Sequence, residues 1–428
     1  MFVSTGKAVW IIAALGLLLV PAASSAAAER PCNGSVELCG RTLDQVVLPG
    51  THNSMSAAEL GWIPPNQTYS ITNQLERGVR SLLFDTYYGI TQPGGSVKAI
   101  GRDEGEATDA RTYMCHALCQ LGFVDLTTEL SHIADFLEAN PREVLTFVNE
   151  DYIAPEAFAK AVEQSGLLPY VYQGSAASFR TLSSMIDSGQ RVVMLAQNEV
   201  GDVPWYHLGY GGPMMETPYT FNSAAELTDP NQLSESCRPN RGGEGSPLFL
   251  MNHWVTTGVS PETAKAAIVN TKAALVARAR ACEQRRGKLP TILAVDFYGT
   301  GDVLGAAREL NGVVARPYLE TTKPKAAKVK AGRKATFRMT LSNYGDVEAE
   351  FVRVCATVAA RLARKPSCDL VDPIAIGGTR TARVRVFTKK TARGFGAVKV
   401  RVVSSAGTLK TSARLTVKPL RKKRVKRG

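Results

Sequence analysis

The sequence lacks the residues and motifs by which the common enzyme classes are recognised. It has only five histidines and four tryptophans among 428 residues. It contains no G-x-S-x-G nucleophile elbow, no H-E-x-x-H zinc motif, no Walker loop and no G-x-G-x-x-G dinucleotide fingerprint. These absences argue against an α/β-hydrolase, a zinc protease of that type, a P-loop nucleotidase and a Rossmann dehydrogenase.

Long apolar runs are also missing after residue 28. A bilayer-spanning helix needs roughly 20 apolar residues, and no later segment of the chain has that length. The first 28 residues combine Lys7, an apolar stretch over Val9–Val20 and the small residues "PAASSAAA". This pattern is typical of a secretory signal peptide cleaved after Ala27 or Ala28. We expect residues 1–28 to be removed and the rest to be secreted and soluble, with a retained N-terminal anchor as the alternative.

All eight cysteines follow this segment. An even number of cysteines in an exported chain indicates disulfides. Closeness along the chain favours the pairs 32–39, 115–119 and 355–368, which leaves 237–282, although a sequence alone does not choose among the many pairings. The Cys-His-x-x-Cys segment at 115–119 is also compatible with a metal, but no second ligand pair stands at zinc spacing.

Acidic residues are scarce in the last quarter of the chain. Residues 321–428 contain 28 Lys and Arg against 5 Asp and Glu, a net charge of +23, whereas the preceding residues have a net charge of −10. Such asymmetry indicates two units with different surfaces. We therefore predict one domain over 29–318, a basic domain over 319–420 and a basic tail over 421–428.

The first unit alternates short apolar runs with helical patterns. The apolar runs of this unit contain few polar residues. Such nearly continuous apolar runs are typical of parallel strands buried on both faces. Segments 126–141 and 261–284 between them have helical spacing of apolar residues. Strands alternating with helices over about 290 residues predict a closed, distorted (β/α)8 TIM-type barrel. The expected strands lie at 44–50, 79–85, 111–116, 143–150, 191–198, 247–254 and 291–299, with an eighth near 167–173.

The basic unit has a different period. Segments 335–341, 382–387, 397–403 and 413–417 alternate apolar residues with Arg, Lys or Thr. A period of two with one charged face is typical of antiparallel strands that have one solvated side. We expect a small all-β, immunoglobulin-like sandwich in a monomeric protein. In an exported chain, its charge favours an anionic membrane or cell-envelope surface over nucleic acid as a partner.

Polar groups that can move a proton or bind a cation stand at or near the ends of six apolar runs. The carboxyl ends of the strands of a parallel barrel form one rim, and enzymes of this fold assemble their chemistry there. A single histidine at a strand end is more often structural, but six such endings together predict a functional rim. The residues are His52, Asn53, Asp85, His116, Glu150, His253 and Asp296.

Two histidines with acids and an amide at one rim suit phosphodiester chemistry. One imidazole can remove a proton from an attacking hydroxyl while another protonates the departing oxygen. Imidazole serves either role near neutral pH, because its ordinary pKa is about 6.5. A carboxylate bonded to one ring nitrogen sets the tautomer, and negative charge on the phosphoryl group needs a cation or fixed donors.

At these residues the chain resembles a known family. The segments "LPGTHNSM", "LERGVRSLLFDTYYG", "YMCHALCQLG" and "FLEANPREVLTFVNEDYI" are similar to the X-domain of phosphatidylinositol-specific phospholipase C. They are more similar to its secreted single-barrel relatives in the phospholipase-C-like phosphodiesterase superfamily. The later segments "TPYTF", "PLFLMNHWV" and "LAVDFYGTGD" resemble the second half of those relatives, so the likeness covers roughly residues 40–315. It implies a distorted α/β barrel that cleaves phospholipids or related phosphodiesters.

The resemblance also implies roles for two histidines and an acid. His52 matches the general base and His116 the general acid of the family. Asp296 is our candidate for orienting His52 from another strand. His253 and the adjacent Trp254 either line the rim or simply pack there.

The metal-dependent branch of the family binds calcium, and three residues match its ligands. They are Asn53, Asp85 and Glu150, although Asn149 or Asp151 competes with Glu150. Leu83 stands where that branch has a glutamate, so one ligand is missing. The metal-independent branch has an arginine at the position of Asp85, which this chain lacks. We expect calcium, with magnesium less favoured, and metal independence stays open.

The sequence thus predicts a secreted phospholipase-C-like phosphodiesterase that uses His52 and His116 as base and acid. Two alternatives stay open. One is a glycerophosphodiester phosphodiesterase-type hydrolase, in which water attacks directly. The other is a barrel without catalysis that binds a lipid or cell-envelope headgroup, which the missing glutamate at Leu83 favours.

Overall fold

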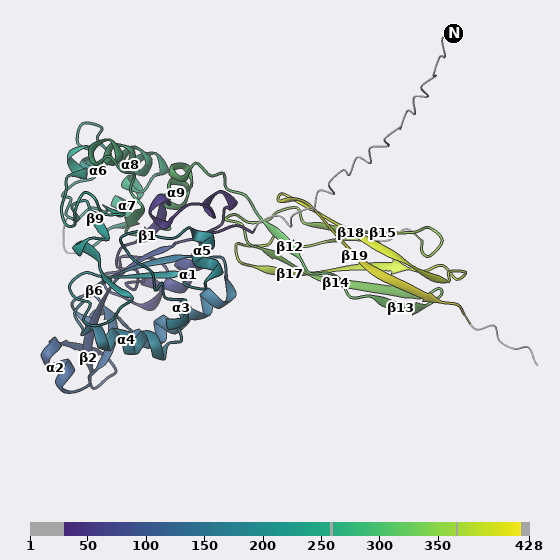
Figure 1. The fold of residues 1–428 in the computed structure, drawn as a ribbon, viewed down its shortest axis with the longest axis horizontal. Helices are drawn as coiled ribbons and strands as arrows, with labels where there is room; N and C mark the ends of the chain where they lie inside the picture. Colours follow the sequence, from purple (N-terminus) through teal and green to yellow (C-terminus); the bar gives the residue numbers. More distant parts are fainter. Residues whose placement is uncertain (1–29, 257–259, 365–366, 421–428) are drawn as a thin grey trace, which may run out of the picture.

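The computed structural model describes residues 30–256, 260–364 and 367–420. An α/β part is followed, from Leu319 onward, by an all-β part that extends along the long axis of the molecule (Figure 1). The predicted signal peptide (1–28) and basic tail (421–428) lie outside the described residues. Within those residues, no helix is both long and apolar enough to cross a bilayer.

The α/β part is built on a curled sheet of parallel strands. Their order is β8-β7-β6-β2-β1-β11-β10-β9, and each neighbouring pair is parallel. In the described chain no pairing joins β8 to β9, so the parallel α/β architecture is confirmed while a closed barrel is not. The strands are β1 (Leu48–Thr51), β2 (Ser81–Thr91), β6 (Leu145–Asp151), β7 (Val192–Ala196), β8 (Tyr206–Leu208), β9 (Met214–Glu216), β10 (Leu248–His253) and β11 (Ile292–Val295).

Two predicted strands are not members of this parallel order. The run 111–116 forms β4 (Arg111–Cys115), which pairs antiparallel with β2 and with β5 (Phe123–Asp125). Strand β2 is 11 residues long, and its second half pairs antiparallel with β3 (Val97–Ile100) and β4. The segment near 167–173 contains a 3₁₀ helix at Leu168–Tyr170 rather than a strand. The short strands β8 and β9, which the sequence analysis missed, complete the set of eight parallel strands.

Helices connect the strands and cover the sheet. The predicted helix after β5 is α3, which begins where the Asp125 side chain accepts the Thr128 N–H and ends before Pro141. The predicted helix over 261–284 is two helices, because Thr271 starts a new one by accepting the Ala274 N–H. The helices are α1 (Ile71–Glu76), α2 (Arg102–Ala107), α3 (Leu126–Ala139), α4 (Pro155–Gln164), α5 (Leu182–Asp187), α6 (Ala225–Thr228), α7 (Thr263–Val269), α8 (Lys272–Arg286) and α9 (Val303–Asn311).

Alternate residues of the curled strands face two different cores. Leu82, Phe84 and Phe147 belong to the larger apolar cluster, which contains the residues of α3, α4 and α8. Leu83 and Val148 belong to a second cluster formed largely by the opposite faces of the same strands. Because side chains alternate along a strand, the polar residues that follow Leu83 and Val148 by two positions point into the curl.

The all-β part has two sheets around one apolar core. Their orders are β12-β14-β17 and β13-β19-β18-β15-β16. Buried Phe337 and exposed Arg338 in β14 illustrate the predicted period of two. Strand β13 pairs parallel with β19, and the described pairing establishes two β-sheets rather than an immunoglobulin-like topology. The strands are β12 (Leu319–Thr321), β13 (Ala327–Lys330), β14 (Lys334–Asn343), β15 (Arg353–Val358), β16 (Cys368–Leu370), β17 (Thr379–Phe387), β18 (Gly394–Ser404) and β19 (Gly407–Lys418).

The two parts meet at the amino ends of the parallel strands. A cavity there is lined by residues just before β1, β2 and β6, such as Val47 and Arg80, together with Asp346 and Ile376 from the all-β part. Asp346 accepts the backbone N–H of Arg316 at 2.8 Å. The all-β part therefore adjoins the end of the sheet opposite its carboxyl rim.

Four disulfides link the cysteines in the pairs favoured by their spacing: 32–39, 115–119, 237–282 and 355–368. The 115–119 segment is thus a disulfide loop rather than a metal site. Disulfides of this number are consistent with an oxidising, extracellular environment.

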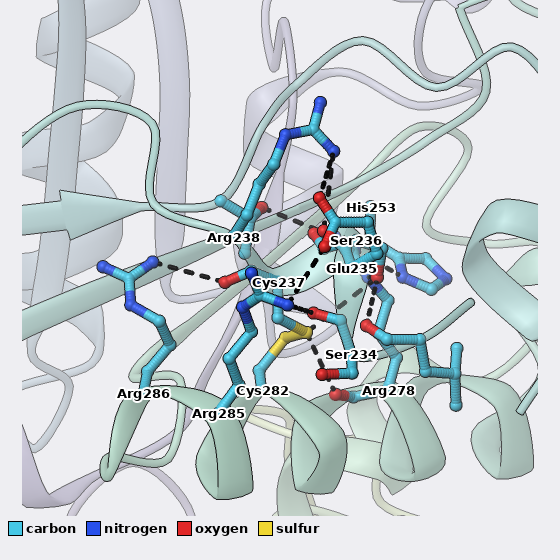
Figure 2. Close-up of a disulfide and its surroundings, with 12 residues drawn as sticks. Ser234, Glu235, Ser236, Cys237, Arg238, His253, Arg278, Cys282, Arg285 and Arg286 are labelled. Carbon is cyan, nitrogen blue, oxygen red and sulfur yellow. Dashed lines mark hydrogen bonds and ion pairs between the residues drawn. A yellow bond between two sulfur atoms is a disulfide. The ribbon is translucent and has the colours of Figure 1, made fainter. Parts of the chain in front are cut away.

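The disulfide between Cys237 and Cys282 joins helix α8 to the 3₁₀ helix Glu235–Cys237, and Figure 2 shows Arg278 beside it. Arg278 is fully buried and donates to the Asn252 carbonyl at 2.6 Å and the Ser236 carbonyl at 3.0 Å. It also lies 3.1 Å from Nδ1 of His253.

His253 is completely buried in this network, with Nε2 2.9 Å from the Val269 carbonyl. Donation from Nε2 to that carbonyl leaves Nδ1 to accept from Arg278, so the ring is neutral. Burial, together with the Arg278 charge, lowers the pKa of His253 to about 3. Of the two interpretations of His253, the structure supports packing and not a rim role.

The buried neutral ring predicts acid sensitivity. Between pH 6.5 and pH 3 the unfolded chain binds a proton at His253 that the folded chain excludes, so stability should fall as pH falls through this window. The free energy of unfolding of the wild type should fall between pH 7 and pH 4. In His253→Gln this fall should be smaller by up to about 3 kcal/mol. Urea unfolding at several pH values measures the difference.

The exposed His132→Gln on α3 is the control; because its ring pairs only with Glu129 among the described residues, it should change the pH profile by much less than His253→Gln does. Parallel pH profiles for wild type and His253→Gln would contradict a neutral buried ring.

Candidate functional site

A cavity of about 140 Å³ opens at the carboxyl end of the curled sheet. Its walls come from β2, β6, β9 and β10 and from residues that follow β1, β7, β8, β9 and β10. Four predicted site residues are in its lining, while His116 and Asp296 are not. The polar and aromatic lining residues are His52, Asn53, Asp85, Glu150, Gln197, Tyr210, Glu216, Tyr219, Arg241, Asn252 and Trp254.

The ring of His52 is held from one side by Asp296. Thr51 and Val295 are register partners in the parallel pair β1–β11, so the next residue of each strand lies beside the other. The His52 Nδ1 is 2.9 Å from the Asp296 Oδ1. A ring nitrogen bonded to a carboxylate bears the proton, which leaves Nε2 free to accept one. The predicted pairing of His52 with Asp296 is therefore present.

The same ring is also stacked on Trp254. The two ring centroids are 3.8 Å apart and the planes are parallel. Trp254 is 7% exposed, and Leu250, Asn252 and Trp254 alternate into the cavity from β10 and its end. This stacking contact fixes the position of the imidazole ring at the cavity.

Asp296 is itself fixed by a second donor. Its Oδ1 accepts from the Asn66 amide at 3.0 Å. The Gln67 amide bridges the backbone carbonyls of His52 and Val295 at 2.8 and 2.9 Å. The segment after β1 thus ties the two strand ends together and holds the His52–Asp296 pair in place.

His116 lies on the loop closed by the Cys115–Cys119 disulfide. Its side chain is exposed, in contrast to His253. Partial burial by its neighbours lowers the pKa of His116 and the nearby His52 lowers it further, while Glu150 and Asp296 oppose this shift. These influences place His116 in the same group of charges, at the edge of the cavity rather than in its wall.

The candidate metal ligands meet in the wall of the cavity. Asp85 and Glu150 are register partners in the parallel pair β2–β6, so their carboxylates extend from adjacent positions. Asp85 is 5% exposed, and its carboxylate accepts no hydrogen bond among the described residues. Burial raises the pKa of Asp85 well above its ordinary value, and the charge of Glu150 raises it further.

Asn53 completes this set from the end of β1. Its backbone has φ 44°, a left-handed conformation that asparagine tolerates better than most residues. Its amide nitrogen donates to the Asn66 side chain at 3.3 Å, so its oxygen is the atom left for the cavity.

The alternatives to Glu150 have structural roles. Asn149 faces the outer core, where it accepts from Thr86 at 3.0 Å and donates to Tyr206 at 2.9 Å. Asp151 accepts backbone N–H groups of the turn after β7, including that of Gln197 at 2.8 Å. Glu150 is the residue of the three that lines the cavity, where its carboxylate accepts the hydroxyl of Tyr152.

This donor set fits a hard cation. Two carboxylates, one of them buried without a hydrogen-bond donor, and a free amide oxygen are the ligand types that calcium and magnesium prefer. Leu83 and Val148 form the apolar lining below them, and Leu83 stands where a third carboxylate was expected. In the described residues no three His, Cys, Asp or Glu side chains form a metal cluster. A cation here would depend on solvent or substrate oxygens for its remaining ligands.

Arg241 and Glu216 are cavity residues that the sequence analysis missed. The Arg241 Nε is 2.5 Å from the Glu216 Oε1. The guanidinium carbon Cζ of Arg241 lies 4.0 Å from the centroid of the Tyr210 ring. Glu216 ends β9, and its position at a strand end was the available signal. Arg241 stands in the glycine-rich loop "NRGGEG", which has no periodic pattern that could have identified it.

The balance of charge in the cavity also favours a cation. Arg241 is paired with Glu216, so that pair has no net charge to offer an anionic ligand. The other acids of the lining, Asp85 and Glu150, form no ion pair with a positively charged side chain among the described residues. An anionic phosphodiester would be repelled unless a cation neutralised the two carboxylates.

Comparison with known proteins identifies a family for the α/β part of the chain. The family model "PI-PLC X 1" matches residues 38–311. An "Uncharacterized secreted protein" of Arthroderma benhamiae is 28% identical over 66% of this chain and 64% of its own length. A "PI-PLC X domain-containing protein 1" of the same fungus is 26% identical over 71% of this chain and 97% of its own.

A PI-PLC X domain-containing protein of Arabidopsis thaliana is 28% identical over 59% of this chain and 58% of its own length. The chain therefore spans somewhat less than two thirds of the first relative and of the plant relative.

The unpaired carboxylate of Asp85 predicts calcium binding that can be measured without any substrate. Saturating calcium should raise the Tm of the wild-type chain by about 2–5 °C, because a ligand that binds only the folded state stabilises it. Asp85→Asn should lose this rise, and its Tm without calcium should not fall, since the change removes a buried like-charge contact. Differential scanning calorimetry with calcium or with EGTA measures both effects.

The exposed Asp187→Asn on α5 is the matched control and should keep the full rise. An equal calcium effect in wild type and Asp85→Asn would exclude this site.

Proposed function

The chain belongs to the PI-PLC X domain family, and from that premise we propose that it is a secreted phosphodiesterase that cleaves a phospholipid or related phosphodiester. The single observation that supports this most is the His52 ring, held by Asp296 and Trp254 in a cavity whose other wall presents Asp85 and Glu150. That arrangement combines a base, its orienting carboxylate and a place for a cation.

His52 is the general base of this proposal. Its Nε2 takes the proton of the attacking hydroxyl, while Asp296 on Nδ1 keeps the ring in the required tautomer. The imidazolium that forms lies between a carboxylate and an indole face, and both favour its positive charge.

His116 is the general acid, donating its proton to the departing oxygen. Its lowered pKa makes it a stronger acid than an ordinary histidine, which assists that transfer. Its exposed position on the disulfide loop suits a group that meets the leaving part of a large substrate at the entrance of the cavity.

Asn53, Asp85 and Glu150 would hold a calcium ion. When bound, the ion would supply the positive charge that stabilises developing negative charge on the phosphoryl oxygens. The preference for calcium over magnesium comes from the family resemblance, because two carboxylates and one amide oxygen suit either ion when water completes its ligands.

The cavity volume favours recognition of a headgroup. About 140 Å³ is smaller than the ~300–1,000 Å³ of most ligand pockets, so the cavity would take part of a polar headgroup while acyl chains stay outside. If the headgroup has a hydroxyl next to the phosphoester, that hydroxyl is the nucleophile and the first product is a cyclic phosphodiester. Without such a hydroxyl, water attacks and the product is a phosphomonoester.

We also propose the domain limits that accompany this function. Residues 1–28 are a signal peptide, 29–318 a distorted TIM-type barrel and 319–420 an immunoglobulin-like sandwich in a monomer. One relative is named a secreted protein, and four disulfides are in keeping with export.

A non-catalytic barrel that binds a headgroup is the second candidate. Leu83, an apolar residue among the site carboxylates, is the observation that favours it. Under that alternative the cavity binds phosphodiesters but the wild-type protein shows no turnover. Substitution of His52 would then change binding only.

The base–acid assignment predicts the outcome of substituting either histidine. Purified protein should hydrolyse phosphatidylinositol in mixed micelles or a glycerophosphodiester, and EDTA should abolish the activity. His52→Ala and His116→Ala should each lower kcat by at least about 10²-fold with folding intact, as expected for loss of a general base or acid. His132→Ala on α3 is the control and should keep wild-type turnover.

Asp296 is predicted to act on the rate rather than on substrate binding. Asp296→Asn should lower kcat by about 10²–10⁴-fold with little change in KM, because the imidazolium loses its counter-charge and the ring its tautomer. Steady-state kinetics of this variant and of Asn66→Ala, which removes only the second donor to Asp296, separate the two effects. A change confined to KM in Asp296→Asn would contradict the orienting role.

A further inference from the structure

The outer face of the five-stranded sheet is basic over four of its strands, β13, β19, β18 and β15, while the edge strand β16 has no lysine or arginine. In β13, β15, β18 and β19 the apolar residues face the core, and the exposed residues between them include eight lysines and arginines. Arg401 of β18 is the register partner of Lys410 of β19, and Lys330 of β13 is the partner of Lys418. The eight are Lys328, Lys330, Arg353, Lys399, Arg401, Lys410, Arg414 and Lys418.

The outer face of the three-stranded sheet is basic as well. Arg338 of β14 is the direct partner of Arg383 of β17, and Lys334 and Arg385 lie on the same face. Glu320 of β12 is the acid at the edge of this face, and it is already paired with Arg30. The two basic faces therefore lie back to back across the shared core.

Among the residues that the structure describes, these positive charges have no acidic partners. Across the described part of residues 319–420, no lysine or arginine forms an ion pair. Like charges on directly opposed residues destabilise a sheet. The all-β part has such pairs on both faces. Binding of an external anion to either face would reduce the repulsion between these positive charges.

We propose that the all-β part is a two-faced binding module for a linear anionic polymer with closely spaced phosphate, sulfate or carboxylate groups. Charge complementarity identifies the class of partner. A planar bilayer would meet one face and leave the other exposed to solvent, whereas flexible polymer chains can lie along the strands of both faces. This inference stands independently of the proposed phosphodiesterase activity.

The position of the module adds a functional consequence. It adjoins the amino ends of β1, β2 and β6, whereas the cavity with His52 opens at their carboxyl ends. Binding through the all-β part therefore holds the molecule by the end away from the cavity (Figure 1). The module tethers the protein and leaves the cavity free for a substrate that comes from elsewhere.

Two triple variants of the full chain test the proposal, one for each face. They are Arg338→Gln/Arg383→Gln/Arg385→Gln and Lys399→Gln/Arg401→Gln/Lys410→Gln. Binding to dextran sulfate and to inorganic polyphosphate is measured by isothermal titration at several salt concentrations. Each variant should weaken binding about tenfold at low ionic strength and reduce the salt dependence, and the combined variant should lose about 10²-fold.

Thermal stability checks that the variants are folded. Both should melt at or above the wild-type temperature at low salt, because like-charge pairs are removed. A control that removes three positive charges from the α/β part, Lys98→Gln/Arg238→Gln/Arg280→Gln, should bind both polymers as wild type does.

Three results would overturn the proposal. Salt-insensitive or absent polymer binding excludes it, and loss of all binding through one face alone excludes a two-faced module. Tighter binding to phosphatidylglycerol vesicles than to either polymer, with the same dependence on the two triple variants, identifies a bilayer as the partner instead.

Discussion

The hydrogen bond between His52 and Asp296 is the interaction on which the candidate site depends. It joins residues 244 positions apart in the sequence at a distance of 2.9 Å. Parallel pairing of β1 with β11 makes this possible, because the register that aligns Thr51 with Val295 places the next residues side by side. The same principle brings Asp85 beside Glu150 through the β2–β6 pair. A shift of one residue in either register would turn these side chains out of the cavity.

The site combines opposing electrostatic demands within a small volume. Asp85 is buried beside Glu150, which is unfavourable for two carboxylates unless a cation or a proton intervenes. Arg241 does not meet this need, because Glu216 already neutralises it. Asp296 and Trp254 hold the ring of His52 at the cavity, whereas Arg278 and Val269 hold the buried His253 neutral. His52 follows β1 and His253 ends β10, with β11 between them, so each histidine has its own set of contacts.

Much of this organisation was predictable from the sequence. The two parts follow from the change of charge near residue 320, and the four disulfides from the spacing of cysteines. The strands that form the centre of the parallel sheet were found because they are nearly continuous in apolar residues. The missed strands β8 and β9 are three residues each, too short for such a pattern. Strand β4 was misplaced because an apolar run does not indicate the direction of its pairing.

The sequence by itself determined which residues could take part in catalysis. The histidines and the acids at strand ends are few, and the end of a strand can be located from the residues next to it. Only the tertiary structure decided which of them meet. It placed His52, Asn53, Asp85 and Glu150 around one cavity, set His116 at its edge, and sealed His253 in packing with Arg278. It also added Arg241, Glu216 and the stacked Trp254. The physical reason is that strand order, register and the direction of each side chain arise from contacts between distant segments, which no local pattern of residues encodes.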